Sequence, residues 1–317
     1  MSLFNVCPAC GELFEAAEDT CPRCGEPRTA EASATSLAEP DVAGAAIEQI
    51  HDWSQVKHEI VEAYLTQYTT ILSQQSFLTR SIYVDAFAGT GFAENVDTGQ
   101  VVPGSAARAM LVEPPFTEIH LIEQRPNRVE ALRAHVAASG DPRVKIHPGD
   151  AVEVLHKKVL KRCRYEDFAR AIVFLDPYGL SVPWTLLAEI GEMKSVEIFF
   201  NFMVVGANRN VLWRDLARVT EKRKLLMDRV WGDRTWEQDL YELGDVDLFG
   251  GTTPVKLSNE RVVEAYRKRL KLKAGFPFVP SPIPVRNSRR ATLYYLFFAS
   301  HNSTGNKIVS HIFSQHG

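Results

Sequence analysis

From Trp53 onward, apolar positions recur first with a helical period and then in short runs that alternate with helical segments. Ile60, Tyr64, Tyr68 and Ile71 lie three or four residues apart, which predicts an amphipathic helix through WSQVKHEIVEAYLTQYTTILSQQ. Short runs rich in β-branched and aromatic residues follow, and they predict the strands SIYVDAFA, EIHLIEQ, VKIHPGD, AIVFLDPYG and VEIFFNF. The segments SAARAMLVE, PNRVEALRAHVAASG, DAVEVLHKKVLKRC and VPWTLLAEIGEM between them have helical patterns. This alternation predicts an α/β fold with an open, mostly parallel sheet.

The alternation of predicted strands and helices is interrupted between about residues 208 and 250. Trp213, Trp231 and Trp236 occur there amid dense charge, which predicts a helical insertion and a natural place for a substrate lid. A helix, SNERVVEAYRKRLKLKAG, and an aromatic strand, TLYYLFFAS, follow the insertion, and SHNSTGNKIVSHIFSQH then predicts a loop and a final helix. We expect the aromatic strand to add antiparallel to the edge of the sheet.

The N-terminus has a different character. The two knuckles Cys7-Pro-Ala-Cys10-Gly and Cys21-Pro-Arg-Cys24-Gly supply four thiolates for one structural zinc ion, which predicts a zinc ribbon over residues 1–25. The gap between the pairs is shorter than the common ~15 to 20 residues, which indicates two abutting knuckles. A disulfide pairing is disfavoured because no signal peptide is recognised, and a redox role for one pair does not explain the duplication. Residues 26–48 are rich in Ala, Glu, Ser, Thr and Pro and predict a flexible linker, so that residues 49–317 form the main domain. Cys163 is expected to be a core or surface thiol.

Composition limits the classes of function. The chain has 317 residues, 45% of them hydrophobic, and a net charge of −3, so there is no general attraction to nucleic acid or to an anionic membrane. Because no apolar run reaches the ~18 to 20 residues that cross a bilayer, a cytoplasmic location is predicted. One region is basic: between Arg261 and Arg290, nine Lys or Arg residues face the single acid Glu264. This region is either a phosphate-binding surface for nucleic acid or a solvated helix face.

Acidic residues end successive predicted strands. Asp85 precedes a turn with Gly89 and Gly91, Glu123 ends the next strand, and Asp150 ends the third. Because the carboxyl ends of parallel strands meet at one crevice, these groups predict a cofactor site. S-adenosylmethionine (SAM) fits the order of the acids, with Asp85 on the methionine amino group, Glu123 on the ribose hydroxyls and Asp150 on the adenine amine. The predicted cofactor residues are Lys57, His58, Asp85, Phe87, Gly89, Gly91, Glu123, Gln124, Asp150, Ala151 and Asp176.

Alternatives exist for several of these residues. Nicotinamide dinucleotide binding would also use Glu123, but the third glycine of its fingerprint is missing after Gly91. The strand-end acids are otherwise read as helix caps. Lys57 and His58 either reach the carboxylate of the cofactor or lie on the surface.

Several motifs together resemble the three-Cys-motif partner protein (TcmP) family. They are VKHEIVEAYL, VDAFAGTG, PGSAARAML, IEQ, PGD, FLDPYG, NFMV and LYYLFFAS, and the resemblance runs from about Trp53 to the C-terminus. It implies a Rossmann-like class I methyltransferase fold, which has a mostly parallel seven-stranded sheet with helices on both faces. It also implies a genomic partner with a radical-SAM-like three-cysteine motif, and no settled substrate. The zinc knuckles lie outside the core of the family.

The motif after the fourth strand points to the methyl acceptor. Asp176-Pro177-Tyr178-Gly179 is similar to the Asp-Pro-Phe-Gly of tRNA guanine-N2 methyltransferases and lacks the second proline of Asp-Pro-Pro-Tyr enzymes. Asp176 would then orient an exocyclic amine, Tyr178 would stack on the base, and Asn201 would line the acceptor pocket. This predicts methylation of a nucleobase amine in RNA or DNA.

Other interpretations of the motif remain open. Asp176 is otherwise a cofactor contact only and Tyr178 a core residue. The chain is alternatively a non-catalytic SAM-binding partner of a three-Cys-motif protein, for example in phage defence, or an enzyme that modifies a protein or a small molecule.

Overall fold

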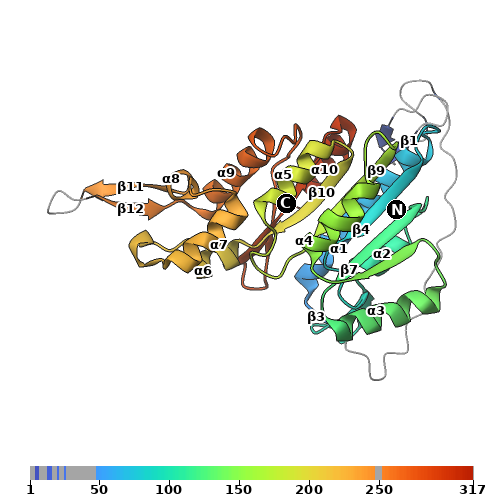
Figure 1. Cartoon of the computed structure of the whole chain (residues 1–317), viewed down its shortest axis with the longest axis horizontal. Coiled ribbons are helices and arrows are strands. Elements are labelled where there is room, and N and C mark those ends of the chain that lie inside the picture. The colour runs from blue at the N-terminus through green and yellow to red at the C-terminus, as the bar shows by residue number, and fades with distance from the viewer. Residues whose placement is uncertain are drawn as a thin grey trace. The chain divides into compact units, whose positions relative to one another are not determined.

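The computed structural model describes residues 4–6, 13–15, 20, 25, 48–246 and 252–316. The predicted zinc ligands Cys7, Cys10, Cys21 and Cys24 and nearly all of the predicted linker lie outside these residues. Strands β1 (Phe4–Val6) and β2 (Leu13–Glu15) pair antiparallel. The chain forms two compact units, Met1–Val173 and Phe174–Gly317 (Figure 1).

A seven-stranded sheet has the order β13-β14-β10-β9-β4-β7-β8. In the first unit, β4 pairs parallel with β7, and β7 pairs parallel with β8. In the second unit, β14 pairs antiparallel with both β10 and β13. The strands are β4 (Arg80–Asp85), β7 (Glu118–Glu123), β8 (Val144–Pro148), β9 (Ala169–Leu175), β10 (Val196–Phe202), β13 (Ile283–Arg286) and β14 (Thr292–Ala299). The predicted mixed α/β fold with a large, mostly parallel sheet is confirmed.

Strand β13 is the one strand of this sheet that the sequence pattern did not predict. It is four residues long and contains Pro284, which has no N–H to donate and therefore suits a sheet edge. Strand β14 is consequently not the edge strand, because it lies between β10 and β13.

The helices of the first unit follow the predicted apolar stripes. Helix α1 (Asp52–Ser73) buries Ile60, Tyr64 and Tyr68, and α2 (Ser105–Met110) packs against it. Helix α3 (Pro126–Ser139) begins with proline and ends at Gly140, whose φ of 62° is the left-handed conformation that glycine adopts at helix ends.

A second, three-stranded sheet follows the glycine turn. Strands β5 (Phe92–Asn95) and β6 (Val101–Pro103) form an antiparallel hairpin, and β3 (Glu48–Ile50) pairs parallel with β5. Gly99, with φ of +71°, lies in the connection between β5 and β6. The sequence pattern did not predict this sheet, because its strands are too short to show a clear alternation.

The helix predicted over Asp150–Cys163 is divided into three short parts. They are α4 (Ala151–Val154), the π-helical turn η1 (Leu155–Val159) and the 3₁₀ turn η2 (Leu160–Arg162). The buried pairs Val154–Leu155 and Val159–Leu160 are five residues apart, and a π turn brings such a spacing onto one face better than an α turn does. Cys163 is fully buried, and burial raises the pKa of its thiol to about 12.

A partly buried polar cluster joins these turns to the sheet. The Glu118 carboxylate accepts hydrogen bonds from Lys145 Nζ (3.0 Å) and Arg162 Nε (2.8 Å) and pairs with His120 Nε2 (3.1 Å). His120 Nδ1 lies 2.9 Å from His147 Nε2, so only one of these two nitrogens carries a proton. The hydrogen bonds from Arg162 hold the pKa of Glu118 at about 2, and burial lowers the pKa of His120 to about 4.

This cluster predicts acid lability. The pKa of His120 is lowered from 6.5 to about 4, so the unfolded chain binds the proton first and stability is lost as the pH falls from about 6.5 towards 4. The shifted pKa of His120 should lower the free energy of unfolding by on the order of 3 kcal/mol over this pH range. Urea unfolding at pH 7.5, 6, 5 and 4 should show this fall, and His120→Asn should give a shallower pH dependence by about one proton. An unchanged slope in the variant would contradict the assignment.

The second unit carries the predicted insertion, which needs correction. Its helices are α6 (Val204–Asn210), η3 (Leu216–Arg218), α7 (Glu221–Trp231) and α8 (Trp236–Asp239), but β11 (Tyr241–Val246) then pairs antiparallel with β12 (Thr252–Lys256). Figure 1 shows this pair as a two-stranded arm beside α8. Trp231 and Trp236 are fully buried, and Trp236 Nε1 donates to Asp228 Oδ1 (2.7 Å), so both tryptophans form the core of the segment.

The remaining helices of the second unit were predicted from the sequence. They are α5 (Trp184–Met193), α9 (Asn259–Leu272) and α10 (Ser303–His316). Ser258 caps α9, since its side chain accepts from the N–H of Arg261. In the described ranges, no helix has both the length and the apolar character of a membrane span.

Candidate functional site

The glycine turn of the first unit is organised around Asp85, which ends β4 and is fully buried. Its carboxylate accepts hydrogen bonds from Phe87 N (3.1 Å), Ser105 Oγ (2.5 Å) and Tyr83 OH (3.3 Å). Asp85 therefore fixes the start of the turn and ties α2 to it. Sequence reasoning named Asp85 and Phe87 but missed Ser105, although it lies in the recognised PGSAARAML segment.

Glu123 ends β7 and faces the same turn. It is nearly buried, and it accepts from Gly89 N (3.1 Å) and Arg125 N (2.7 Å). A further backbone bond from Ala88 N to Ile122 O (2.9 Å) joins the turn to β7. Each carboxylate oxygen can accept more than one hydrogen bond, so Glu123 can still receive hydroxyl donors.

The backbone conformation of Gly89 favours glycine. Its φ is +61°, and a Cβ there would lie 2.7 Å from Glu48 Oε2. Glu48 and Glu123 flank Arg128, whose guanidinium lies 3.5 Å from the first carboxylate and 4.0 Å from the second. No local pattern points to Glu48 or Arg128, because Glu48 follows a stretch of biased composition and Arg128 has a helical surface pattern.

The third strand end differs from the first two. Asp150 is exposed and caps α4, with Oδ1 accepting from Glu153 N (3.0 Å), so the alternative reading as a helix cap describes its contact. Ala151 is buried behind it, and Gln124 is exposed next to Glu123. An exposed acid beside the end of β8 can still accept a hydrogen bond from an amine.

Lys57 and His58 are buried on α1, so the prediction that they lie on the surface is wrong. Burial, followed by the charges of Lys57 and Arg108, lowers the pKa of His58 well below 6.5. His58 Nδ1 has no hydrogen-bond partner within the described residues, and it is therefore a neutral, buried polar atom that a ligand can satisfy.

The turn distinguishes between cofactors. In dinucleotide-binding proteins the glycines open a helix whose N-terminus binds the pyrophosphate. Here Gly91 leads directly into strand β5, and a carboxylate, Asp85, precedes the turn. Ammonium, ribose hydroxyl and adenine amine groups are all hydrogen-bond donors, and they match the acceptors Asp85, Glu123 and Asp150. The turn thus places acceptors at the strand ends and lacks the helix N-terminus that a pyrophosphate binds.

The second unit contains the predicted acceptor residues. Asn201, on β10, is fully buried and donates its side-chain N–H to Asp176 Oδ1. Because a carboxylate can only accept, this bond orients the amide and leaves Asn201 Oδ1 as an acceptor, with no partner in the described part of the chain. The pair therefore includes Asn201 Oδ1 as an acceptor, beside the second N–H of the same amide.

Tyr178 is 62% exposed, so its predicted alternative, a core position, is wrong. Pro177 is buried, and Gly179 has φ of +76°, which lets the chain turn sharply after the tyrosine. The turn packs on α6, where a Cβ at Gly206 would lie 3.7 Å from Gly179 Cα. The result is a fixed turn with a flat aromatic face directed to solvent.

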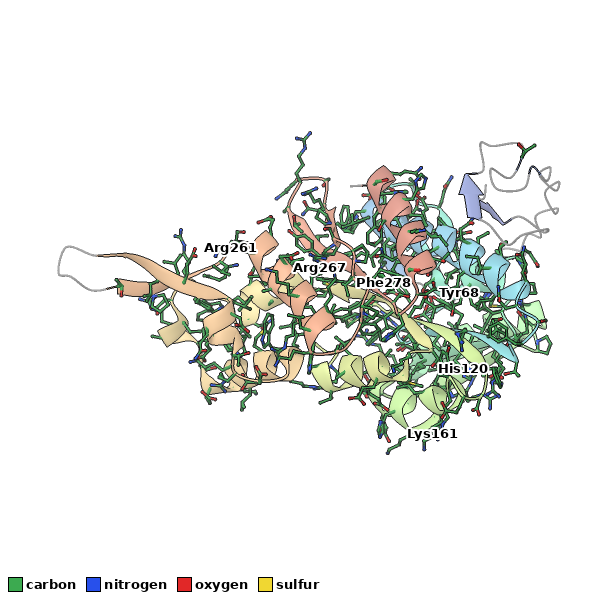
Figure 2. All side chains as sticks on the ribbon, turned by 90° about the horizontal axis from the view of Figure 1, so that it is seen from above. Tyr68, His120, Lys161, Arg261, Arg267 and Phe278 are labelled. Carbon is green, nitrogen blue, oxygen red and sulfur yellow. The ribbon has the colours of Figure 1, made fainter. Side chains whose placement is uncertain are left out.

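The basic region from Arg261 to Arg290 is not one surface. Figure 2 labels Arg261 and Arg267, and both are ion-paired: Arg261 to Glu242 (2.7 Å) and Arg267 to Glu264 (2.7 Å). Arg269 pairs with Asp233 (2.5 Å) and is mostly buried. Arg261 and Arg269 tie α9 to neighbouring segments, whereas the Arg267–Glu264 pair lies within α9 itself. The exposed basic residues without an ion pair in the described part of the chain are Lys268, Lys273, Arg286, Arg289 and Arg290.

Among the residues that the structure describes, no group of three or more His, Cys, Asp or Glu side chains is placed to hold a metal ion. The four cysteines of the predicted ribbon are not among those residues.

No family model and no curated protein matches the chain. Similar solved structures include yhhF from Escherichia coli, assigned as a methyltransferase, with 10% identity over 75% of this chain and 86% of that one, and a TM-score of 0.30. A protein from Listeria monocytogenes assigned as a SAM-dependent methyltransferase has 10% identity over 76% and 100%, with a TM-score of 0.38. The N-terminal domain of EvdMO1 with SAH bound has 13% identity over 78% and 79%, with a TM-score of 0.34. Likeness at this level carries no inference about activity.

Proposed function

We propose that this chain is a SAM-dependent methyltransferase that acts on an exocyclic amine of a nucleobase in RNA or DNA. The observation that carries the proposal is the Asp176–Asn201 pair, which offers oxygen acceptors next to an exposed aromatic ring, Tyr178. An aromatic amine attached to a flat base has the complementary features, since it has N–H donors and a π face. The acids of the glycine turn support SAM as the donor.

The residues of each unit have separate tasks in this proposal. Asp85, Glu123 and Asp150 would hold the amino group, the ribose and the adenine of SAM. Asp176 would accept an N–H of the substrate amine, which aims the nitrogen lone pair and receives the proton lost after transfer. Asn201 would position Asp176 through its N–H. SAM supplies an electrophilic methyl group on a sulfonium, so one C–S bond breaks as one C–N bond forms.

Methyl transfer from tritiated SAM to total tRNA, rRNA, genomic DNA and free nucleosides tests the proposal. Label should enter nucleic acid, and nuclease digestion should place it on an amino-methylated base. Label on none of these, with SAM binding intact by calorimetry, would overturn the proposed acceptor class. In that case the chain would be a SAM-binding partner protein, or an enzyme for a protein or small molecule.

Tyr178→Ala should weaken binding of the acceptor without changing that of SAM. Stacking of a base on an aromatic side chain contributes ~1 to 3 kcal/mol, so KM for the nucleic acid should rise roughly 5- to 150-fold. Tyr178→Phe keeps the flat face and should remain close to the parent. Equal losses in both variants would mean that the hydroxyl, rather than stacking, carries the effect.

Two further assignments rest on the sequence. Membership of the TcmP family, with a three-Cys-motif protein as partner, is supported by the motifs from Trp53 to the C-terminus. Structural zinc at Cys7, Cys10, Cys21 and Cys24 is supported by their paired spacing. The ribbon would then be a recognition module beside the methyltransferase.

A further inference from the structure

The turn between β13 and β14 separates three arginines from the rest of the basic region. Arg286, Arg289 and Arg290 are exposed, and none of them has an ion pair in the described part of the chain. The positive charge of Arg286 contributes to lowering the pKa of the Glu260 carboxyl, so these two residues interact electrostatically. The arginines of α9 have ion-pair partners, whereas the three arginines of this turn have none in the described part of the chain.

The turn is held by one side chain. Asn287 Oδ1 accepts from the backbone N–H groups of Arg289 and Ala291 (3.0 Å each). Two backbone bonds close the loop, from Asn287 N to Ala291 O (3.0 Å) and from Arg290 N to Asn287 O (2.8 Å). A turn with four internal hydrogen bonds presents its exposed arginines from a fixed backbone, which lowers the entropic cost of binding.

Arg290 has a left-handed backbone, with φ of +57°. Such a conformation costs a non-glycine residue on the order of 1 kcal/mol, and Gly or Asn is the usual choice there. The backbone of the turn therefore does not favour arginine at this position.

The strand register places the β13–β14 turn at the same end of the sheet as the carboxyl end of β10, where Asn201 lies. Leu296 on β14 is paired with Asn201 on β10 and with Ile283 on β13. Because β14 runs antiparallel to both, β13 runs parallel to β10, and its carboxyl end points to the same edge. Arg286 lies three residues beyond Ile283, which is about 10 Å along β13. Because β13 is two strands away from β10, Arg286 is also displaced about 10 Å sideways from Asn201.

We propose that the β13–β14 turn binds backbone phosphate of the nucleic acid whose base is held at Asp176 and Asn201. The proposal rests on the proposed function and deepens it, because it makes the substrate a polymer rather than a free base. A separation of roughly 14 Å corresponds to a few nucleotides, so the phosphates would be neighbours of the target base. The planar guanidinium fork suits phosphate oxygens.

The test compares three proteins by fluorescence anisotropy with labelled single-stranded RNA and DNA of about 20 nucleotides and with tRNA, at several salt concentrations. The turn variant is Arg289→Ala with Arg290→Gly, and the charge-matched control is Lys268→Ala with Lys273→Ala. The control lysines lie about 12 and 20 Å along α9 from Glu260, and so away from the turn. The turn variant should bind on the order of tenfold more weakly, with a slope of log K against log salt reduced by about two.

Three readouts distinguish a binding role from a structural one. Arg290→Gly alone should raise the unfolding midpoint, because it relieves the left-handed strain, and should still lower affinity. Arg289→Lys with Arg290→Lys should restore most of the salt slope. Methyl transfer to an oligonucleotide should suffer in KM at unchanged kcat, and transfer to a free nucleoside should not change.

The outcomes separate the two proposals. If the parent protein binds nucleic acid and the turn variant has the same affinity and salt slope, the phosphate site is refuted and the proposed function stands. If the control lysines account for the loss instead, the site is likewise refuted. If the parent protein binds none of the probes while it still binds SAM, the nucleic-acid acceptor is refuted, and the phosphate site with it.

Discussion

An Asp176→Asn variant is expected to lose methyl transfer by a factor on the order of 10² to 10³ in kcat, with its affinity for SAM changed only slightly. The substitution keeps the size of the side chain and removes the charge that attracts and receives the proton of the amine. It also disturbs the hydrogen bond that Asn201 donates, because the acceptor at position 176 becomes an amide in place of a carboxylate. Single-turnover transfer at saturating SAM measures the loss.

A different result would change the role of Asp176. If SAM affinity falls and kcat at saturating SAM stays the same, Asp176 is a cofactor contact only, as the alternative interpretation of its motif holds. Asn201→Ala should give a smaller loss than Asp176→Asn, because it removes a positioning bond and leaves the acceptor in place. The pH dependence of kcat should shift in the Asn201→Ala variant, whereas a merely structural role would leave it unmoved.

Replacing Glu123 with Ala should weaken SAM binding on the order of 100-fold. Two hydrogen bonds from ribose hydroxyls to a carboxylate contribute about 1.5 kcal/mol or more each, and Gly89 N and Arg125 N lose their acceptor as well. Calorimetry with SAM measures the change, and a thermal melt checks that the protein is folded. Saturating SAM should restore kcat to within a few-fold, in contrast to Asp176→Asn.

The matched control for this change is Glu123→Gln, which keeps the size of the side chain and one oxygen acceptor, and should fall between the parent and the alanine variant. NADH should not compete with SAM, because β5 takes the place of the helix that a pyrophosphate needs. Unchanged SAM affinity in a folded Glu123→Ala protein, or competition by NADH, would contradict the assignment of the glycine turn.

Long apolar runs made most of the sheet predictable. The strand at Ala169–Leu175 is buried almost throughout, and its run of β-branched and aromatic residues is unambiguous. The π turn was not predictable as such, because apolar residues five apart fit the tolerance of a helical pattern. The β13 strand was hidden by Pro284, whose presence argues against a central strand and leaves the edge position open.

The candidate site was predictable where chemistry depends on residue type and order, and less so where it depends on partners distant in sequence. Asp85 and Glu123 were recognised because acids at strand ends are informative. Ser105 and Glu48 act through contacts 20 and 41 residues away, which no local pattern records. The basic region shows the same limit, since Arg269 is neutralised by Asp233 on another element.

The contact between Glu48 and Gly89 has a consequence for where the chain can be divided. Strand β3 lies just before α1, and it belongs to the small sheet with β5 and β6 rather than to the seven-stranded sheet. A protein that began at Asp52 would retain every strand of the large sheet and would lose the carboxylate beside Gly89, together with one of the two that flank Arg128. The part of the chain that builds the glycine turn therefore includes Glu48, upstream of α1.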